Sequence, residues 1–182
     1  MIIASQKRKE NISEYLLYMW QIEDIIRANS LDIEKIKKQV IDPYPISDQQ
    51  KKEMTEWYES LIEMMRREGV VEKGHLQINK NVLASMVELH QSLLQDPKHS
   101  DYNAEFYRTL PYIVELRAKA GEEKPGEIEA CFNALYGMLL LRLKGQNISA
   151  ETQNAIKQIS KFLALLTKFY HLDEKGELNS SD

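Results

Sequence analysis

Cysteine, glycine and proline are scarce in this chain. Its 182 residues include one cysteine, Cys131, together with seven glycines and five prolines. A single cysteine excludes an intramolecular disulfide and is typical of a reducing compartment. Because glycine and proline interrupt regular structure, so few of them favour long helices separated by short connections.

Long hydrophobic runs are also missing. The longest dense apolar stretch, residues 131–143, falls well short of the ~20 residues that cross a bilayer. The chain opens with apolar residues and then Lys7, Arg8 and Lys9, whereas a secretory signal has its charges first. We therefore expect a cytoplasmic protein with no membrane partner.

No excess of one charge is present. Lysine and arginine total 24 and aspartate and glutamate 28, which gives a net charge of −4. Proteins that bind nucleic acids usually carry a basic patch, because neutralising phosphates supplies much of their affinity. The even balance predicts that no nucleic acid is bound.

What the sequence does contain is helical periodicity. Apolar residues recur at spacings of three and four over most of the chain, and capping signals such as Asn11, Ser47 and Ser149 precede several of these segments. The expected helices cover about 5 or 11 to 29, 32–41, 47–68, 80–95, 100–120 with a kink or break at Pro111, 126–144 and 149–171. Residues 70–78 fit either a short hairpin or a loop. These patterns predict an all-α fold, an antiparallel helical bundle of six or seven helices, in one domain spanning 1–182 with a polar tail from about residue 173.

The segment 126–144 is apolar almost all round, which is typical of a central helix with neighbours on several sides. Its sparse face carries Ala130, Ala134 and Gly137, where small side chains would let another helix approach closely.

The opening of the chain resembles a known family. Residues 1–4, 7–12 and 14–20, followed by Glu23-Asp24 and by Ile26 to Asn29, resemble the start of a bacterial family labelled domain of unknown function, DUF4924. The length matches as well, so the resemblance covers the whole chain. It implies a small cytoplasmic bacterial protein, and it brings no activity, substrate or site residues.

Glu23 is the most unusual polar residue of the first long helix. On a helical wheel it falls at the centre of the apolar face formed by residues such as Leu16, Met19 and Ile26. A buried carboxylate without a partner is costly, and Arg27 stands four residues on at the spacing of a helical ion pair. Two interpretations stay open: a structural ion pair, or a carboxylate that faces a ligand pocket.

His90 is a similar case, because it lies among apolar residues in the segment 80–95. A histidine there is either a hydrogen-bonded core residue or a ligand or proton shuttle. If His90 meets Glu23 and Arg27 in the fold, the three would line one polar cavity. We assign no catalytic residues, no metal ligands and no cofactor, because no nucleophile, nucleotide or paired Glu-x-x-His pattern is present.

Three functions follow in order of preference. The first is a non-enzymatic helical protein that acts through protein–protein contacts, with self-association as a homodimer expected because symmetric dimers are the commonest oligomers. The second is a small-molecule binding module that uses Glu23, Arg27 and His90. The third is an enzyme that uses the same residues as acid, base and anion clamp.

Overall fold

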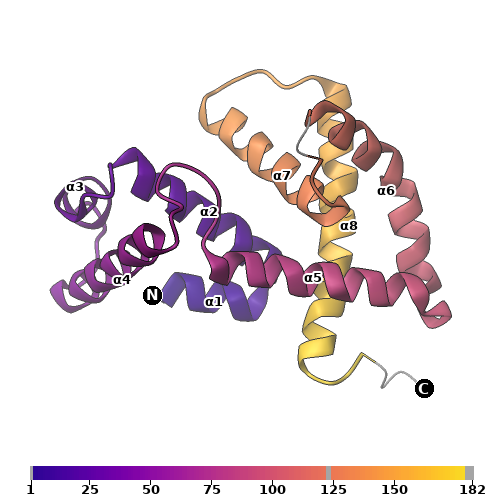
Figure 1. The fold of residues 1–182 in the computed structure, drawn as a ribbon, viewed down its shortest axis with the longest axis horizontal. Coiled ribbons are helices and arrows are strands. Elements are labelled where there is room, and N and C mark those ends of the chain that lie inside the picture. The colour runs from indigo at the N-terminus through magenta and orange to yellow at the C-terminus, as the bar shows by residue number, and fades with distance from the viewer. Residues whose placement is uncertain (1, 122–123, 179–182) are drawn as a thin grey trace. The chain divides into compact units, whose positions relative to one another are not determined.

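Helices make up all the regular structure in the part of the chain that our computed structural model describes, residues 2–121 and 124–178 (Figure 1). The elements are α1 (Ile2–Glu10), α2 (Ile12–Ala28), α3 (Ile33–Ile36), the π-helical turn η1 (Lys37–Ile41), α4 (Asp48–Arg67), α5 (Gln77–Gln95), the 3₁₀ turn η2 (Pro97–His99), α6 (Ser100–Lys119), α7 (Glu127–Leu143) and α8 (Ala150–Glu174). The prediction of an all-α protein is confirmed. None of these helices is both long and apolar enough to cross a membrane.

The chain divides into two compact units, Met1–Val82 and Leu83–Asp182. Helix α5 begins in the first unit and continues into the second. The single domain expected from the sequence stays a prediction.

Local capping explains where the helices begin. Asn11 has an extended backbone and its side chain accepts a hydrogen bond from the amide of Glu14, so the expected first helix divides into α1 and α2. Ser47 and Gln50 form a complete capping box at α4, and Ser149 caps α8. The division at Asn11 explains why the described residues hold eight α-helices rather than six or seven.

The loop, one of the two alternatives expected after α4, is confirmed. It covers residues 70–76 and contains no strand, whereas α5 starts at Gln77, three residues before the expected position. Helix α6 runs without interruption through Pro111, so no break occurs there.

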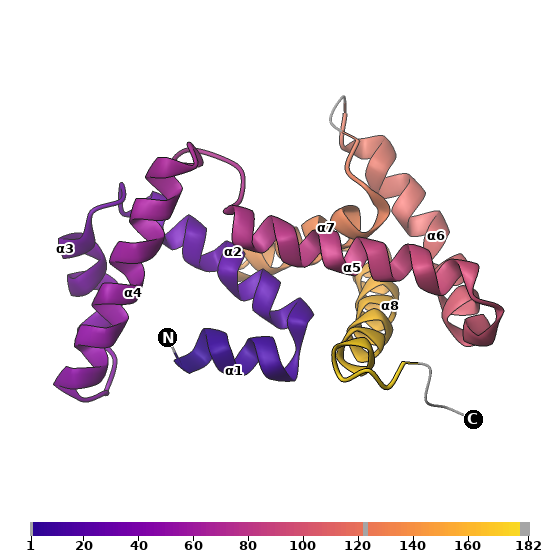
Figure 2. The ribbon, with the colours of Figure 1, turned by 60° about the horizontal axis from the view of Figure 1, so that its bottom comes forward.

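The first unit is built around α2 and α4. Helices α1 and α2 pack against each other, and α3, η1 and α4 pack together (Figures 1 and 2). The largest fully buried side chains of this unit are Ile12, Leu16, Met19, Ile26, Ile36, Ile41, Tyr58, Leu61 and Met65.

The end of α2 is conformationally unusual. The amide of Ser30 bonds to the carbonyl of Arg27 and that of Leu31 to the carbonyl of Ile26, which is the Schellman arrangement of a helix end. Glycine normally takes the left-handed position, yet here Ser30 and Leu31 both have a φ of 57°. Burial of Leu31, which is 7% exposed, offsets the strain of this conformation.

In the second unit α6, α7 and α8 pack pairwise against one another. Their shared core is aromatic, with Tyr102 and Phe106 from α6 and Phe162 and Phe169 from α8 within about 6 Å of one another in ring pairs.

Helix α7 is less enclosed than its composition predicts. Residues 139–141 are only half-buried, and Leu143 is 72% exposed. No atom lies within 4 Å of the position that a Cβ on Gly137 would occupy, so the expected close helix contact is not made there. An apolar composition on all sides therefore overestimates how many neighbours this helix has.

Candidate functional site

A buried carboxylate organises the most polar cluster of the first unit. The side chain of Glu23, on α2, is fully buried. Its Oε1 accepts hydrogen bonds from the backbone amide of Leu76, at 2.9 Å, and from Nδ2 of Asn79, at 2.6 Å. Its Oε2 lies 2.6 Å from Nδ1 of His75. Both oxygens of the carboxylate are therefore satisfied by groups from residues 75–79.

A second contact, in addition to the hydrogen bond with Glu23, holds the ring of His75. It stacks on Trp20, with ring centroids 4.2 Å apart and planes inclined by 13°. Because a carboxylate only accepts hydrogen bonds, the geometry assigns a hydrogen to Nδ1 of His75. The side chain is 32% exposed, so this dyad is partly open to solvent.

Arg27 holds the same loop by a second set of contacts. Its guanidinium donates to the carbonyl of Val70, at 3.1 Å, and to the carbonyl of Gly74. It also forms an ion pair with Asp24 at 2.9 Å. The predicted ion pair between Glu23 and Arg27 is therefore wrong: the two side chains come from neighbouring turns of α2 but bind different parts of the loop.

His90 belongs to the second unit and has other partners. Its Nδ1 lies 2.6 Å from the hydroxyl of Tyr102, and its Nε2 lies 3.4 Å from a carboxylate oxygen of Glu127. Burial lowers the pKa of His90, and the nearby Glu127 opposes that shift. The imidazole of His90 lies inside an aromatic core, in T-shaped contact with the rings of Phe106 and Phe162.

The structure thus brings Glu23 and Arg27 to one loop and places His90 in a separate network. The hydrogen-bond partners of Glu23 and those of His90 have no residue in common. A single polar cavity lined by all three stays a prediction.

Sequence reasoning missed His75 and Asn79 as partners of Glu23. His75 lies in a loop without periodicity and Asn79 lies in the first turn of α5, and His75 is 52 positions away from Glu23. The local signal was limited to Gly74, whose φ of 85° marks a sharp turn just before the histidine.

A second buried carboxylate, Glu105, links α6 to α8. It is 5% exposed and accepts hydrogen bonds from Lys161 at 2.9 Å, Gln158 at 2.8 Å and Arg108 at 3.2 Å. The hydrogen bond from Lys161 is the main cause that lowers the pKa of Glu105. Lys161 of α8 therefore pairs with Glu105 across the two helices.

Cys131 has the environment of an inert thiol. It is fully buried on α7, and burial, reinforced by Glu127, raises its pKa to about 12. A thiol that stays protonated at neutral pH is a poor nucleophile. Among the described residues, no three histidine, cysteine, aspartate or glutamate side chains are grouped so as to hold a metal ion.

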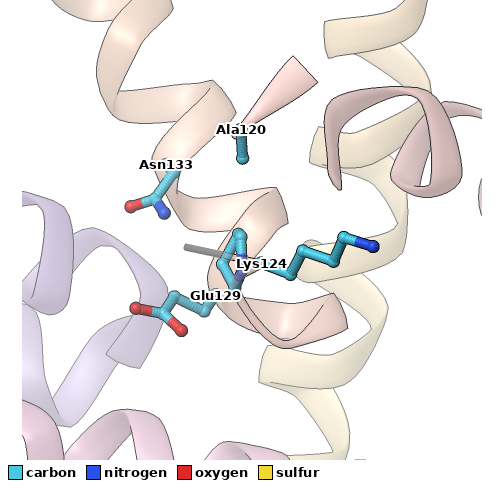
Figure 3. Close-up of a pocket in the computed structure, with 5 residues that line it drawn as sticks. Ala120, Lys124, Glu129 and Asn133 are labelled. Carbon is cyan, nitrogen blue, oxygen red and sulfur yellow. The ribbon is translucent and has the colours of Figure 1, made fainter. Parts of the chain in front are cut away.

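A shallow hollow of about 400 Å³ lies on the second unit and is lined by Ala120, Lys124, Pro125, Glu129 and Asn133. In Figure 3 the side chains of Glu129 and Asn133 project from α7 to one side, whereas the Lys124 ammonium points the other way. Because these polar groups diverge, the hollow does not assemble a converging set of ligands for a substrate.

These observations define the class: an all-α protein whose buried polar residues tie helices and loops together. The chain belongs to the family described as domain of unknown function (DUF4924), whose model matches residues 1–177. The resemblance seen in the opening residues is thereby confirmed over nearly the whole chain. Searches of curated proteins and of solved structures found no match.

Proposed function

We propose that this protein is a non-enzymatic helical protein that acts through protein–protein contacts and associates with itself as a homodimer through α6. The observation that carries the proposal is a second apolar stripe on α6 that faces away from the core. The proposal retains the antiparallel bundle, the cytoplasmic and bacterial setting, and the absence of nucleic-acid, membrane and cofactor partners expected from the sequence.

The outward stripe has the spacing of a coiled-coil seam. Its members, all exposed, alternate steps of three and four residues along the helix. They are Ala104, Tyr107, Pro111, Val114 and Ala118. At 3.6 residues per turn they fall within an arc of about 80° and extend for about 21 Å.

The inward face of α6 is already occupied, so the stripe is additional to the core. Tyr102, Phe106, Thr109 and Ile113 are buried at the same three-and-four spacing on nearly the opposite side of the helix. In contrast Tyr107 is 65% and Val114 55% exposed. Two large exposed apolar side chains one heptad apart are typical of a surface that docks against another helix.

Charges beside the stripe favour a second copy as the partner. Arg108 and Glu115 flank the stripe on the same side, with side chains 67% and 54% exposed. An antiparallel pairing with its twofold axis beside residues 111–112 places Arg108 of each copy near Glu115 of the other, because their positions are symmetric about that point. The same residue pair then forms two equivalent contacts across the dimer.

Analytical ultracentrifugation over a range of protein concentrations tests the proposal. A seam of this length is at the small end of protein interfaces, so we expect a dissociation constant of about 10–100 µM. Tyr107→Lys should abolish the dimer, and Val71→Lys, which changes an exposed apolar residue of the first unit, should leave it intact. A monomer at every concentration would refute the proposal.

A charge reversal tests the antiparallel geometry separately. Arg108→Glu and Glu115→Arg should each weaken association, because each places like charges opposite each other. The double variant restores the opposite charges and should recover most of the affinity. A double variant as weak as both singles would exclude this arrangement, and circular dichroism would show whether each variant is folded.

A further inference from the structure

The first unit contains a small hollow that is not lined by Glu23 or by its hydrogen-bond partners. It is walled by residues of α1, α2 and α4 and by the first turn of α5. They are Ala4, Ser5, Arg8, Tyr15, Met19, Trp57, Ser60, Leu61, Met64 and Ile78. The hollow has a volume of about 200 Å³ and most of its wall is aromatic or aliphatic.

Arg8 is the only charged side chain in this lining. Its guanidinium carbon lies 5.6 Å from the centroid of the Tyr15 ring, in a cation–π contact. Within the described residues no carboxylate lies within ion-pairing distance of Arg8, although Lys7 of the same helix pairs with Glu14. The hollow therefore combines apolar walls with an exposed guanidinium that contacts Tyr15 and pairs with no carboxylate of the described residues.

We propose that this hollow binds a small carboxylate with a short apolar tail. The tail would lie against Met19, Trp57 and Met64, and the carboxylate would accept hydrogen bonds from Arg8. This site is separate from the outward stripe of α6 and does not depend on self-association.

The volume limits the size of the ligand. At about 30 Å³ for each water-sized group, 200 Å³ holds about seven such groups, which is close to the roughly eight non-hydrogen atoms of a six-carbon acid. For so small a ligand we expect a dissociation constant of about 1 mM.

The charge of the ligand's head group distinguishes a binding site for an acid from a gap left by imperfect packing. An apolar gap would take an alcohol and an acid of the same length about equally well, because only the tail is buried. A site built around Arg8 prefers the acid, by about five- to tenfold for a partly exposed ion pair.

Hexanoate and 1-hexanol are the probes, and the methyl groups of the methionines are the reporters. With ¹³C-methyl methionine in the full chain, hexanoate should shift the NMR signals of Met19 and Met64, which line the hollow. Met86 and Met138 lie in the second unit and serve as internal references. Hexanol should give the same shifts only at about five- to tenfold higher concentration.

Three variants complete the test. Arg8→Gln should lower hexanoate affinity to that of hexanol, whereas Arg67→Gln, which removes an exposed arginine outside the hollow, should change neither. Ser60→Leu should fill the space and weaken both ligands at least about tenfold. Equal affinities for acid and alcohol in the unmodified chain, or no shift of Met19 and Met64 with either at about 20 mM, would overturn the proposal.

Discussion

Replacement of Glu23 by alanine should destabilise the first unit strongly. The change removes the acceptor for the amide of Leu76, for Nδ2 of Asn79 and for Nδ1 of His75. The amide and Asn79 contacts are fully buried, so their donors would lose a partner without gaining water. Each buried donor left unsatisfied costs about 1–3 kcal/mol.

Because His75 is partly exposed, water can replace its bond at little cost. Two buried donors and the cavity left by the side chain then give a loss of about 3–5 kcal/mol in the free energy of unfolding. That is a large share of the 5–15 kcal/mol typical of whole proteins. In contrast Glu23→Gln keeps one carbonyl oxygen for Leu76 and Asn79, so we expect a loss of only about 1–2 kcal/mol.

Urea unfolding followed by tryptophan fluorescence measures these differences, since Trp20 stacks directly on His75. Glu63→Ala, an exposed acidic residue of α4, is the matched control and should change stability by less than about 0.5 kcal/mol. If Glu23→Ala costs less than 1 kcal/mol, roughly the value for one ordinary hydrogen bond, then the carboxylate does not hold the loop and the reasoning fails.

Three further predictions concern single residues. Since burial lowers the pKa of His90, the unfolded chain takes up its proton first as the pH falls, and the free energy of unfolding should decrease below about pH 6.5. His90→Gln should flatten that slope in urea titrations between pH 5 and 8, and an unchanged slope would contradict the assignment. The pKa of Cys131 is raised to about 12, so at pH 8 this thiol should react with a thiol reagent only after the surrounding structure unfolds. Labelling of the native protein that is faster than unfolding would disprove its burial. Ser30→Gly should raise the free energy of unfolding by about 0.5–1 kcal/mol, because glycine adopts a φ of 57° without strain, and calorimetry showing a lower melting temperature would refute this.

Much of the fold could be predicted because its signals are local. Asn11, Ser47 and Ser149 satisfy amides within a few residues of themselves, so the sequence near each cap contains all the information needed. The stripe of α4 likewise follows largely from spacing: of the six apolar residues that share one face, all but Trp57 are buried, namely Met54, Tyr58, Leu61, Ile62 and Met65.

The candidate site could be predicted only in part, because its partners come from distant positions. The wheel position of Glu23 indicated correctly that the carboxylate is buried and needs a partner. Spacing along α2 then favoured Arg27, whereas the loop supplies His75 from 52 positions away and the amide of Leu76 from 53. Contacts of this kind depend on how the chain returns to α2, which periodicity does not determine.

The outward stripe of α6 shows a different limit. Its three-and-four spacing was visible, but the buried stripe on the opposite face has the same spacing, and a wheel does not say which face the rest of the chain covers. Pro111, which lies in the outward stripe, was interpreted only as a helix breaker. The exposures of Tyr107 and Val114 supply the missing distinction.

The contacts of Glu23 also determine which fragments of this chain can keep their structure. The carboxylate of one helix supplies the acceptor for the backbone just before α5, so the start of α5 is specified by a residue on α2. A peptide that begins at residue 77 carries every residue of α5 but not that acceptor, and its first turn would fray in isolation. A fragment that retains α2 and residues 70–82 keeps both halves of the contact. Any dissection of the protein into pieces should therefore leave these two segments on the same piece.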